Sequence, residues 1–161
     1  MTAAPFHPVD VFLLLIRADH VLLGLRAKTG YADGQWNLPS GKLESSEDVV
    51  SAVIREAREE VGIRLRPEKL RLAAVVHHLS SPTHARVGLA FTAAFEPGEH
   101  GEPTNAEPLK CAGIEWFPLG ALPPNTTSFT AACVQAFLDG QPLRLSGWPL
   151  AHGETSAHKL P

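Results

Sequence analysis

Cysteine is scarce in this sequence. Only Cys111 and Cys133 occur among 161 residues, and they lie far apart without a CxxC or other zinc-ligand spacing. This spacing argues against a disulfide framework and a cysteine-based zinc site. We expect both thiols to be reduced and partly buried at most.

Long apolar runs are also missing. The longest, residues 11–16, is too short to span a bilayer, which takes a helix of about 20 apolar residues. The first ten residues, MTAAPFHPVD, contain an acidic side chain and lack the basic segment with which a signal peptide begins. We therefore predict a cytoplasmic protein without a membrane span.

Neither sign of charge dominates the chain. Its 14 Lys and Arg and 17 Asp and Glu give a formal net charge of −3 with histidine neutral. This balance gives no broad attraction to nucleic acid or to an anionic membrane. An anionic substrate would have to be bound locally, by a metal ion or by a few basic side chains.

The hydrophobic pattern predicts a mixed α/β domain. Runs rich in branched and aromatic residues predict strands at residues 9–17, 21–26, 70–79, 86–95 and 113–117. Helices are expected in the second half of residues 41–63 and at 126–138, with loops at 80–85 and 96–111. From residue 141 the sequence is rich in Pro, Gly and His without periodicity. We predict one domain over 1–140 and an irregular tail over 141–161.

The helix expected within residues 41–63 has clear sequence signals at both ends. Ser45 or Ser46 is the expected N-cap, because Ser45 followed by Asp48 resembles a capping box. Gly62 is expected to end the helix in the left-handed conformation. One apolar stripe facing the core is predicted from the spacing of Val50, Val53, Ile54, Ala57 and Val61.

The same helix carries an electrostatic conflict. Glu56 and Glu60 are four residues apart on one face, where like charges repel by roughly a few tenths of a kcal/mol. Together with Glu59 they lie near the helix C-terminus, whose partial negative charge disfavours carboxylates. A conflict without an evident structural gain indicates a functional site. A divalent cation on this face would reverse both penalties, and oxygen ligands of this kind suit Mg²⁺.

The glycine and charged positions of this stretch follow one pattern, G-x5-E-x7-R-E-A-x-E-E-x-G-I. Its members are Gly41, Glu47, Arg55, Glu56, Ala57, Glu59, Glu60, Gly62 and Ile63. The pattern resembles the signature of Nudix hydrolases, the MutT-like enzymes that cleave a nucleoside diphosphate linked to another group. Ala57 replaces a larger aliphatic residue, and Ser40 departs from the commoner Pro-Gly-Gly; we expect both to be tolerated.

The resemblance implies a fold and a metal site. The fold is a Nudix-type α/β/α sandwich, with a central mixed β-sheet between the 41–63 loop-helix and the C-terminal helix. The metal ligands would be Glu56, Glu59 and Glu60, with the backbone carbonyl near Gly41. The cofactor would be Mg²⁺, with Mn²⁺ as a substitute. The metal would neutralise phosphate charge and lower the pKa of the attacking water.

The implied catalytic residues are Glu56, Glu59, Arg55 and Glu107. Arg55 can pair with Glu59 one turn later and hold it in position. One glutamate, on the helix or on a distant loop, takes the proton from water. Glu107 falls where MutT-like relatives carry a loop glutamate near the metal. The weaker alternatives for that role are Glu102 and Glu115.

Three residues are candidates for contact with the substrate. Arg26 matches a phosphate-contacting position of the relatives, and the alternative is an ordinary surface arginine. Lys42 follows Gly41 and either meets a phosphate or faces water. Asn125 lies where MutT-like enzymes place an asparagine that hydrogen-bonds a purine base, but it would also serve as the N-cap of the next helix.

The predicted function is Mg²⁺-dependent hydrolysis of a (deoxy)nucleoside triphosphate or modified nucleotide by water attack at phosphorus. ADP-ribose-type members carry a proline beyond the signature where this chain has Leu79. The alternatives are a nucleotide sensor without turnover, a hydrolase of another compound such as a nucleotide sugar, and an interaction protein with an acidic surface helix. The expected partner is a small-molecule nucleotide, not a nucleic-acid polymer or a membrane, and a homodimer stays open.

Overall fold

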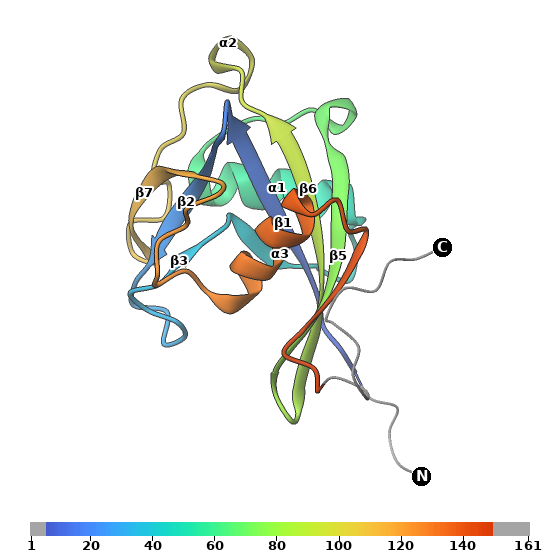
Figure 1. Ribbon diagram of the computed structural model, residues 1–161. Coiled ribbons are helices and arrows are strands. Elements are labelled where there is room, and N and C mark those ends of the chain that lie inside the picture. Colours follow the sequence, from blue (N-terminus) through green and yellow to red (C-terminus); the bar gives the residue numbers. More distant parts are fainter. Residues whose placement is uncertain (1–5, 150–161) are drawn as a thin grey trace.

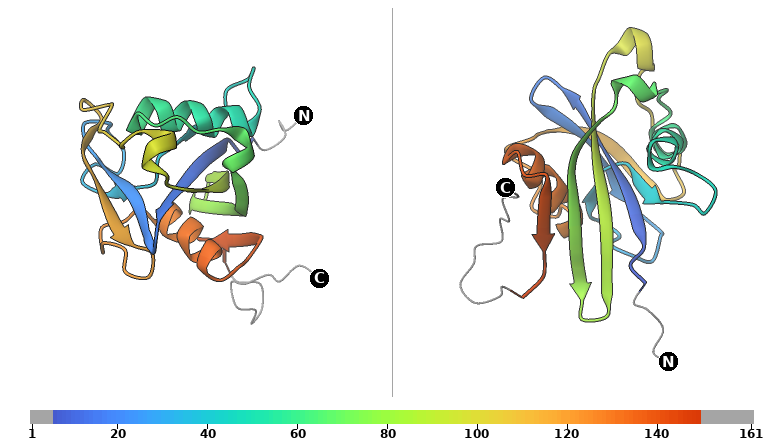
Figure 2. Two further views of the ribbon diagram at one scale, coloured as in Figure 1. Left: turned by 90° about the horizontal axis from the view of Figure 1, so that it is seen from above. Right: turned by 90° about the vertical axis from the view of Figure 1, so that its right-hand side faces the viewer.

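The computed structural model describes residues 6–149. They form one mixed β-sheet of eight strands with a helix on each face, as Figures 1 and 2 show. The elements are β1 (Val9–Arg17), β2 (His20–Arg26), β3 (Trp36–Asn37), β4 (Ser40–Lys42), α1 (Val49–Val61), η1 (Pro67–Lys69), β5 (Arg71–Ser81), β6 (His84–Ala94), α2 (Pro97–His100), β7 (Cys111–Pro118), α3 (Ser128–Leu138) and β8 (Leu143–Ser146). The predicted α/β/α sandwich is confirmed.

Strand β1 lies at the centre of the sheet. The strand order is β3-β2-β1-β6-β5-β8, with β4 paired to β1 and β7 paired to β2. β1 runs parallel to β6 and antiparallel to β2 and β4. Residues 11–15 are at most 4% exposed, because helices cover both faces of the strand. This burial explains why β1 is a continuous apolar run rather than an alternating one.

Side chains along β1 alternate between two hydrophobic cores. Val11 and Leu13 pack with the buried face of α1, and Phe12 and Leu14 pack with α3 on the other side. Figure 2 shows the two helices on opposite sides of the sheet. Cys133 of α3 is 0% exposed, so the prediction of partial burial at most is wrong for this thiol. It fills a small apolar position against the sheet.

Helix α1 begins later than predicted. Its N-cap is Asp48, whose carboxylate accepts hydrogen bonds from two backbone N–H groups of the first turn, both at 2.9 Å. Ser45 and Ser46 lie in the preceding turn, so the predicted serine caps are wrong. Gly62 ends the helix at φ 69° as predicted, and its N–H donates to the carbonyl of Arg58.

The hairpin of β5 and β6 is longer than predicted. β5 continues to Ser81 and β6 starts at His84, so the turn contains only Pro82 and Thr83 instead of residues 80–85. The expected loop at 96–111 also contains the one-turn helix α2. Both differences concern the ends of strands and the loops next to them, where a sequence pattern predicts boundaries least well.

The chain forms one more strand after residue 140. Residues 143–146 form β8, which pairs in parallel with β5, and the indole N–H of Trp148 donates to the carbonyl of His77 at 2.9 Å. The prediction of an irregular segment is therefore wrong for 143–146, and 150–161 lie outside the described residues. Within the part of the chain that the structure describes, no helix is long and apolar enough to cross a membrane.

The N-cap of α1 gives the first testable prediction. Asp48→Ala should lower the free energy of unfolding by about 1 kcal/mol, because it leaves the first-turn N–H groups without their acceptor. Ser45→Ala and Ser46→Ala are matched controls in the adjacent turn and should change it by less than about 0.5 kcal/mol. Urea denaturation of the three variants measures the difference. Equal losses in all three would contradict the assignment of Asp48 as the cap.

Candidate active site

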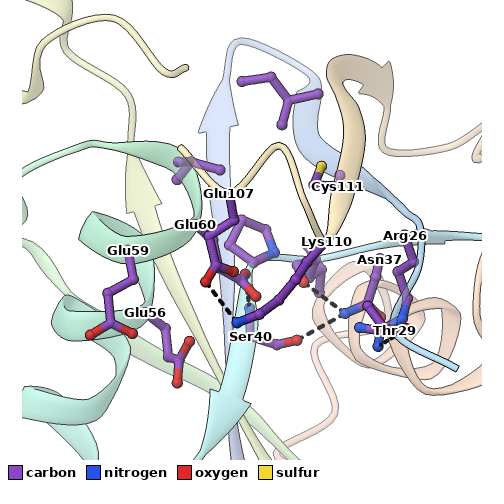
Figure 3. A pocket seen from close by; sticks show the side chains of 15 residues that line it. Arg26, Thr29, Asn37, Ser40, Glu56, Glu59, Glu60, Glu107, Lys110 and Cys111 are labelled. Carbon is purple, nitrogen blue, oxygen red and sulfur yellow. Dashed lines mark hydrogen bonds and ion pairs between the residues drawn. The ribbon is translucent and has the colours of Figure 1, made fainter. Parts of the chain in front are cut away.

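The glutamates of α1 face a cavity that is also lined by residues of β2, β4 and β7. The cavity has a volume of about 350 Å³ and is lined by Glu56, Glu59 and Glu60, with Glu107 from the loop before β7. Arg26 of β2 lies on the opposite side from the helix glutamates (Figure 3). The structure thus brings the predicted metal ligands, the loop glutamate and one predicted phosphate contact into a single space.

Gly41 lies next to the side chain of Glu56. A Cβ built on Gly41 would lie 1.8 Å from Oε1 of Glu56, far inside van der Waals contact, so only glycine fits here. Gly41 pairs with Val11 in the β4–β1 ladder. Its neighbours Ser40 and Lys42 point to the other face of the sheet because side chains alternate along a strand.

Glu60 is a carboxylate held in a largely apolar and acidic environment. Its Oε2 accepts a hydrogen bond from the backbone N–H of Ser40 at 2.8 Å. Desolvation outweighs that hydrogen bond and raises the pKa of Glu60 to about 8, with a smaller contribution from the charges of Glu56 and Glu107. At neutral pH the site therefore favours a proton or a cation on Glu60.

Glu56 has a similar but less extreme environment. Desolvation raises the pKa of this carboxyl, the neighbouring charges of Glu59 and Glu107 act in the same direction, and its ion pair with Arg55 opposes them. The guanidinium of Arg55 donates to Oε1 of Glu56 at 2.6 Å. Two neighbouring acids with raised pKa values in one cavity are typical of a functional site.

Arg55 holds three glutamates at once. It donates to both carboxylate oxygens of Glu47 at 3.0 and 2.6 Å, to Glu56 at 2.6 Å and to Glu59 at 3.2 Å. The predicted pair with Glu59 is present and is the longest of these contacts. The hydrogen bonds from Arg55 lower the pKa of Glu47. Glu47 therefore fastens the loop before α1 to the helix and does not line the cavity.

The loop that carries Glu107 is attached to the end of α1. The backbone N–H groups of Thr104 and Ala106 donate to the carbonyls of Val61 and Glu60 at 3.0 and 3.1 Å. These carbonyls belong to the last turn of the helix, which lacks partners within the helix itself. The attachment directs Glu107 into the cavity. The weaker alternatives, Glu102 and Glu115, are exposed and lie outside it.

Basic groups line the side of the cavity away from α1. Arg26 is fixed by the loop after β2, donating to the carbonyl of Tyr31 at 3.0 Å and to the hydroxyl of Thr29 at 3.1 Å. Lys110 also lines the cavity and pairs with Glu107 at 2.8 Å. Lys110 is not among the residues predicted from the sequence, because its only sequence signal is its position three residues after Glu107.

Two predicted substrate contacts lie outside this cavity. Lys42 is exposed and lines a second cavity on the α3 face. The side-chain amide of Asn125 donates to the carbonyl of Gly34 at 2.8 Å and so fastens a loop. The alternative reading of Asn125 as the N-cap of the next helix is wrong, because Thr127 caps α3 through its hydroxyl.

The donor set fits a hard divalent cation. Among residues 6–149, no three Asp, Glu, His or Cys side chains already converge on one point, since Glu56 is turned onto Arg55 and Glu60 onto the Ser40 amide. Glu60 nevertheless makes no ion pair with any described residue, and Gly41 leaves its backbone open beside Glu56. Carboxylates outnumber cationic side chains here, and the Gly41 backbone beside them carries no side chain. Such a set of oxygen ligands suits Mg²⁺ or Mn²⁺.

Known proteins include relatives that are similar to this chain in sequence. A MutT-like protein of Streptomyces ambofaciens is 39% identical over 69 residues, which are 43% of this chain and 43% of that protein. The oxidized purine nucleoside triphosphate hydrolase of Mus musculus is 29% identical over 112 residues, 69% of this chain and 66% of that enzyme. The chain thus spans less than two thirds of either relative.

The solved structures include a similar fold. The MutT NUDIX hydrolase of Burkholderia pseudomallei superposes with a TM-score of 0.72 at 31% identity, over 81% of this chain and 98% of that one. The sequence profile described as NUDIX domain matches residues 6–137, which include the glutamate helix and most of the sheet. The chain therefore belongs to the Nudix hydrolase family.

Proposed function

We propose that this chain is a Mg²⁺-dependent hydrolase of a nucleoside triphosphate or a modified nucleotide, with water attacking phosphorus. The observation that carries the proposal is the cavity in which Glu56, Glu59, Glu60 and Glu107 face Arg26. Carboxylates on one wall suit a divalent cation, and a guanidinium on the other suits phosphate oxygens. The family supports a nucleoside diphosphate linked to another group as the substrate class.

Each wall of the cavity has a separate part in this proposal. Glu56, Glu59, Glu60 and the Gly41 backbone would hold the cation, which when bound neutralises phosphate charge and lowers the pKa of water. Arg26 would bind the phosphate chain. Arg55 does not touch the substrate; it orients Glu56 and Glu59 through its ion pairs.

The general base belongs to the glutamates of the cavity. Glu56 and Glu107 are the candidates, because both line the cavity and a carboxylate there can accept a proton from an attacking water. Lys110 forms an ion pair with Glu107. For Glu107 to act as the base, this ion pair would have to break, for example when Lys110 binds a phosphate instead. Glu107→Gln therefore separates the two candidates: it stops turnover only if the loop glutamate is the base.

The substrate is proposed to be a nucleoside triphosphate, including oxidised forms. The mouse relative is named as a hydrolase of oxidised purine nucleoside triphosphates. The similarity covers 66% of that enzyme but only 43% of the Streptomyces protein. The second candidate is a nucleotide sensor that binds without turnover. The favourable ligand set for a cation argues for catalysis, because binding alone does not require an activated water.

The helix glutamates supply the test of catalysis. Glu56→Gln and Glu60→Gln should each reduce turnover by about 10²-fold or more while the fold stays intact, because each removes a negative ligand from the cavity. Phosphate and pyrophosphate release from nucleoside triphosphates in Mg²⁺ measures the loss. Glu102→Gln is the matched control on an exposed loop. Full activity in both helix variants would refute the metal assignment, and binding without turnover in the wild type would favour the sensor.

The raised pKa of Glu60 predicts how stability depends on pH without metal. The folded pKa of about 8 exceeds the usual 4.5, so between about pH 5 and 8 the native state binds more protons than the unfolded state. Stability must then fall as pH rises through that window, by up to about 1.4 kcal/mol per pH unit. Glu60→Gln should remove this part of the pH dependence.

Thermal unfolding in EDTA at several pH values measures the effect. Histidines and other acids also titrate, so the difference between wild type and Glu60→Gln is the relevant quantity, with Glu102→Gln as the reference variant. Adding Mg²⁺ at pH 8 should raise the Tm of the wild type more than that of Glu60→Gln, since a cation binds the ionised carboxylate. Parallel pH curves for wild type and Glu60→Gln would contradict the raised pKa.

A further inference from the structure

Lys110 is a cation at the carboxylate cavity whose partner is weakly held. Its Nζ forms an ion pair with Oε1 of Glu107 at 2.8 Å, and both side chains line the cavity. In Figure 3 the Lys110 side chain extends from the β7 side of the cavity toward the glutamates. The Lys110 side chain is 63% exposed and that of Glu107 is 29% exposed. An exposed ion pair between long side chains is weak, so Lys110 can leave this partner easily.

The backbone of Lys110 is fixed although its side chain is exposed. Its N–H donates to the carbonyl of Glu107 at 2.9 Å, and its carbonyl accepts from the N–H of Ala27 at 2.9 Å. The next residue, Cys111, pairs with Arg26 in the β2–β7 ladder. The Cα of Lys110 is thus held beside the end of β2, and only its four-carbon side chain is free to move.

The two arginines at the site are bound more firmly than Lys110. Arg55 contacts three glutamates, and Arg26 donates to a carbonyl and a hydroxyl of the loop after β2. A guanidinium binds through a rigid fork of donors, whereas an ammonium is a compact charge with three rotatable donors on a flexible stem. Lys110 is therefore the cationic side chain of this site that is best suited to change its partner.

Lys110 belongs to the same electrostatic cluster as the glutamates of α1. The hydrogen bond and the charge of Glu107 raise the pKa of Lys110, and the charges of Glu60 and Glu56 act in the same direction. Desolvation is the main cause of the raised pKa values of Glu60 and Glu56, and the charge of Glu107 adds to both. The Lys110 ammonium thus supplies part of the positive charge that a divalent cation would supply to these carboxylates.

Binding of a cation and a phosphate chain would change the best partner for Lys110. A divalent cation among the glutamates repels the ammonium and competes with it for the carboxylate of Glu107. Phosphate oxygens in the same cavity offer the ammonium a charge-assisted hydrogen bond to a group with more negative charge than one carboxylate. The released ammonium would lie beside the end of β2, where Arg26 is proposed to bind the phosphate chain. Exchange of partners therefore needs only a rotation of the lysine side chain.

We propose that Lys110 is a phosphate-binding residue that exchanges partners: its ammonium neutralises Glu107 in the metal-free protein and passes to the phosphate chain when a divalent cation binds the glutamates. This inference rests on the proposed function for the position of the phosphate chain. It goes further because it assigns two opposite effects to one side chain. In the metal-free protein Lys110 opposes cation binding, and in the metal-loaded protein it favours phosphate binding.

Two calorimetric titrations of Lys110→Met test these effects. In the nucleotide-free protein the variant should bind Mn²⁺ about 2- to 5-fold more tightly than the wild type, because the metal no longer displaces an exposed ion pair. At saturating Mn²⁺ the probe is imidodiphosphate, a hydrolysis-resistant analogue of a phosphate chain. Here the variant should bind about 10-fold more weakly, since one charge-assisted contact is lost. A merely structural lysine would weaken both interactions when it is replaced.

Three further variants control for charge and structure. Lys69→Met breaks the ion pairs of a lysine with Glu96 and Glu99 outside the cavity and should change neither affinity. Lys110→Arg retains a cation and should stay closer to the wild type than Lys110→Met in both titrations. In the Glu107→Gln background, Lys110→Met should tighten Mn²⁺ binding by less than about 2-fold, because the ammonium has no carboxylate there to give up. Thermal unfolding of each variant verifies that it is folded.

The two titrations separate this inference from the proposed catalysis, because neither needs turnover. If no nucleoside triphosphate is hydrolysed but Lys110→Met shifts the two affinities in opposite directions, the hydrolase proposal fails and partner exchange by Lys110 stands. Weaker or unchanged Mn²⁺ binding in a folded Lys110→Met variant overturns the inference, as does imidodiphosphate binding that is absent in the wild type or unchanged in the variant. Equal tightening of Mn²⁺ binding in the Glu107→Gln background also overturns it, since the effect would then not come from Glu107.

Discussion

The ion-pair network of Arg55 is the interaction on which the site depends. One guanidinium joins the loop before α1 through Glu47, the helix through Glu56 and Glu59, and strand β4 through the Lys42 carbonyl at 3.3 Å. Three segments of different secondary structure are thereby held in one arrangement. The contacts also explain why acidic side chains tolerate each other near the helix C-terminus: the cation within the cluster offsets their repulsion.

The network leaves Glu60 uncompensated. Arg55 reaches the other two helix glutamates, but Glu60 has only the Ser40 amide and a raised pKa. A buried carboxyl whose pKa is raised, and which forms no ion pair with a described residue, is expected of a functional residue rather than of a structural one. The electrostatic conflict that the sequence shows at residues 56–60 is thus resolved for two carboxylates by the fold and left open for the third.

The sequence predicts best what repeats within one element. The apolar run of β1 and the stripe on α1 identify their buried faces, because each pattern is set by a single strand or helix. The sequence predicts poorly those features that depend on contacts between residues far apart in the chain. Three residues near the start of α1 were all suitable caps, β8 is too short to show a period, and the Asp10–Arg86 pair joins residues of two strands far apart in the sequence. None of these follows from local spacing.

Strand β4 explains how one short segment serves both cavities. The missing side chain of Gly41 makes room for Glu56, Ser40 lines both cavities, and Lys42 lines the cavity that also contains Arg86. The alternation along the strand therefore places the Gly41 backbone beside Glu56 and the Lys42 side chain at the second cavity. No hydrogen bond or ion pair within residues 6–149 joins the glutamates of α1 to the Asp10–Arg86 pair, so a substitution of that pair should leave the Arg55 network intact. The two cavities are connected through Arg26, Asn37 and Ser40, which line both of them.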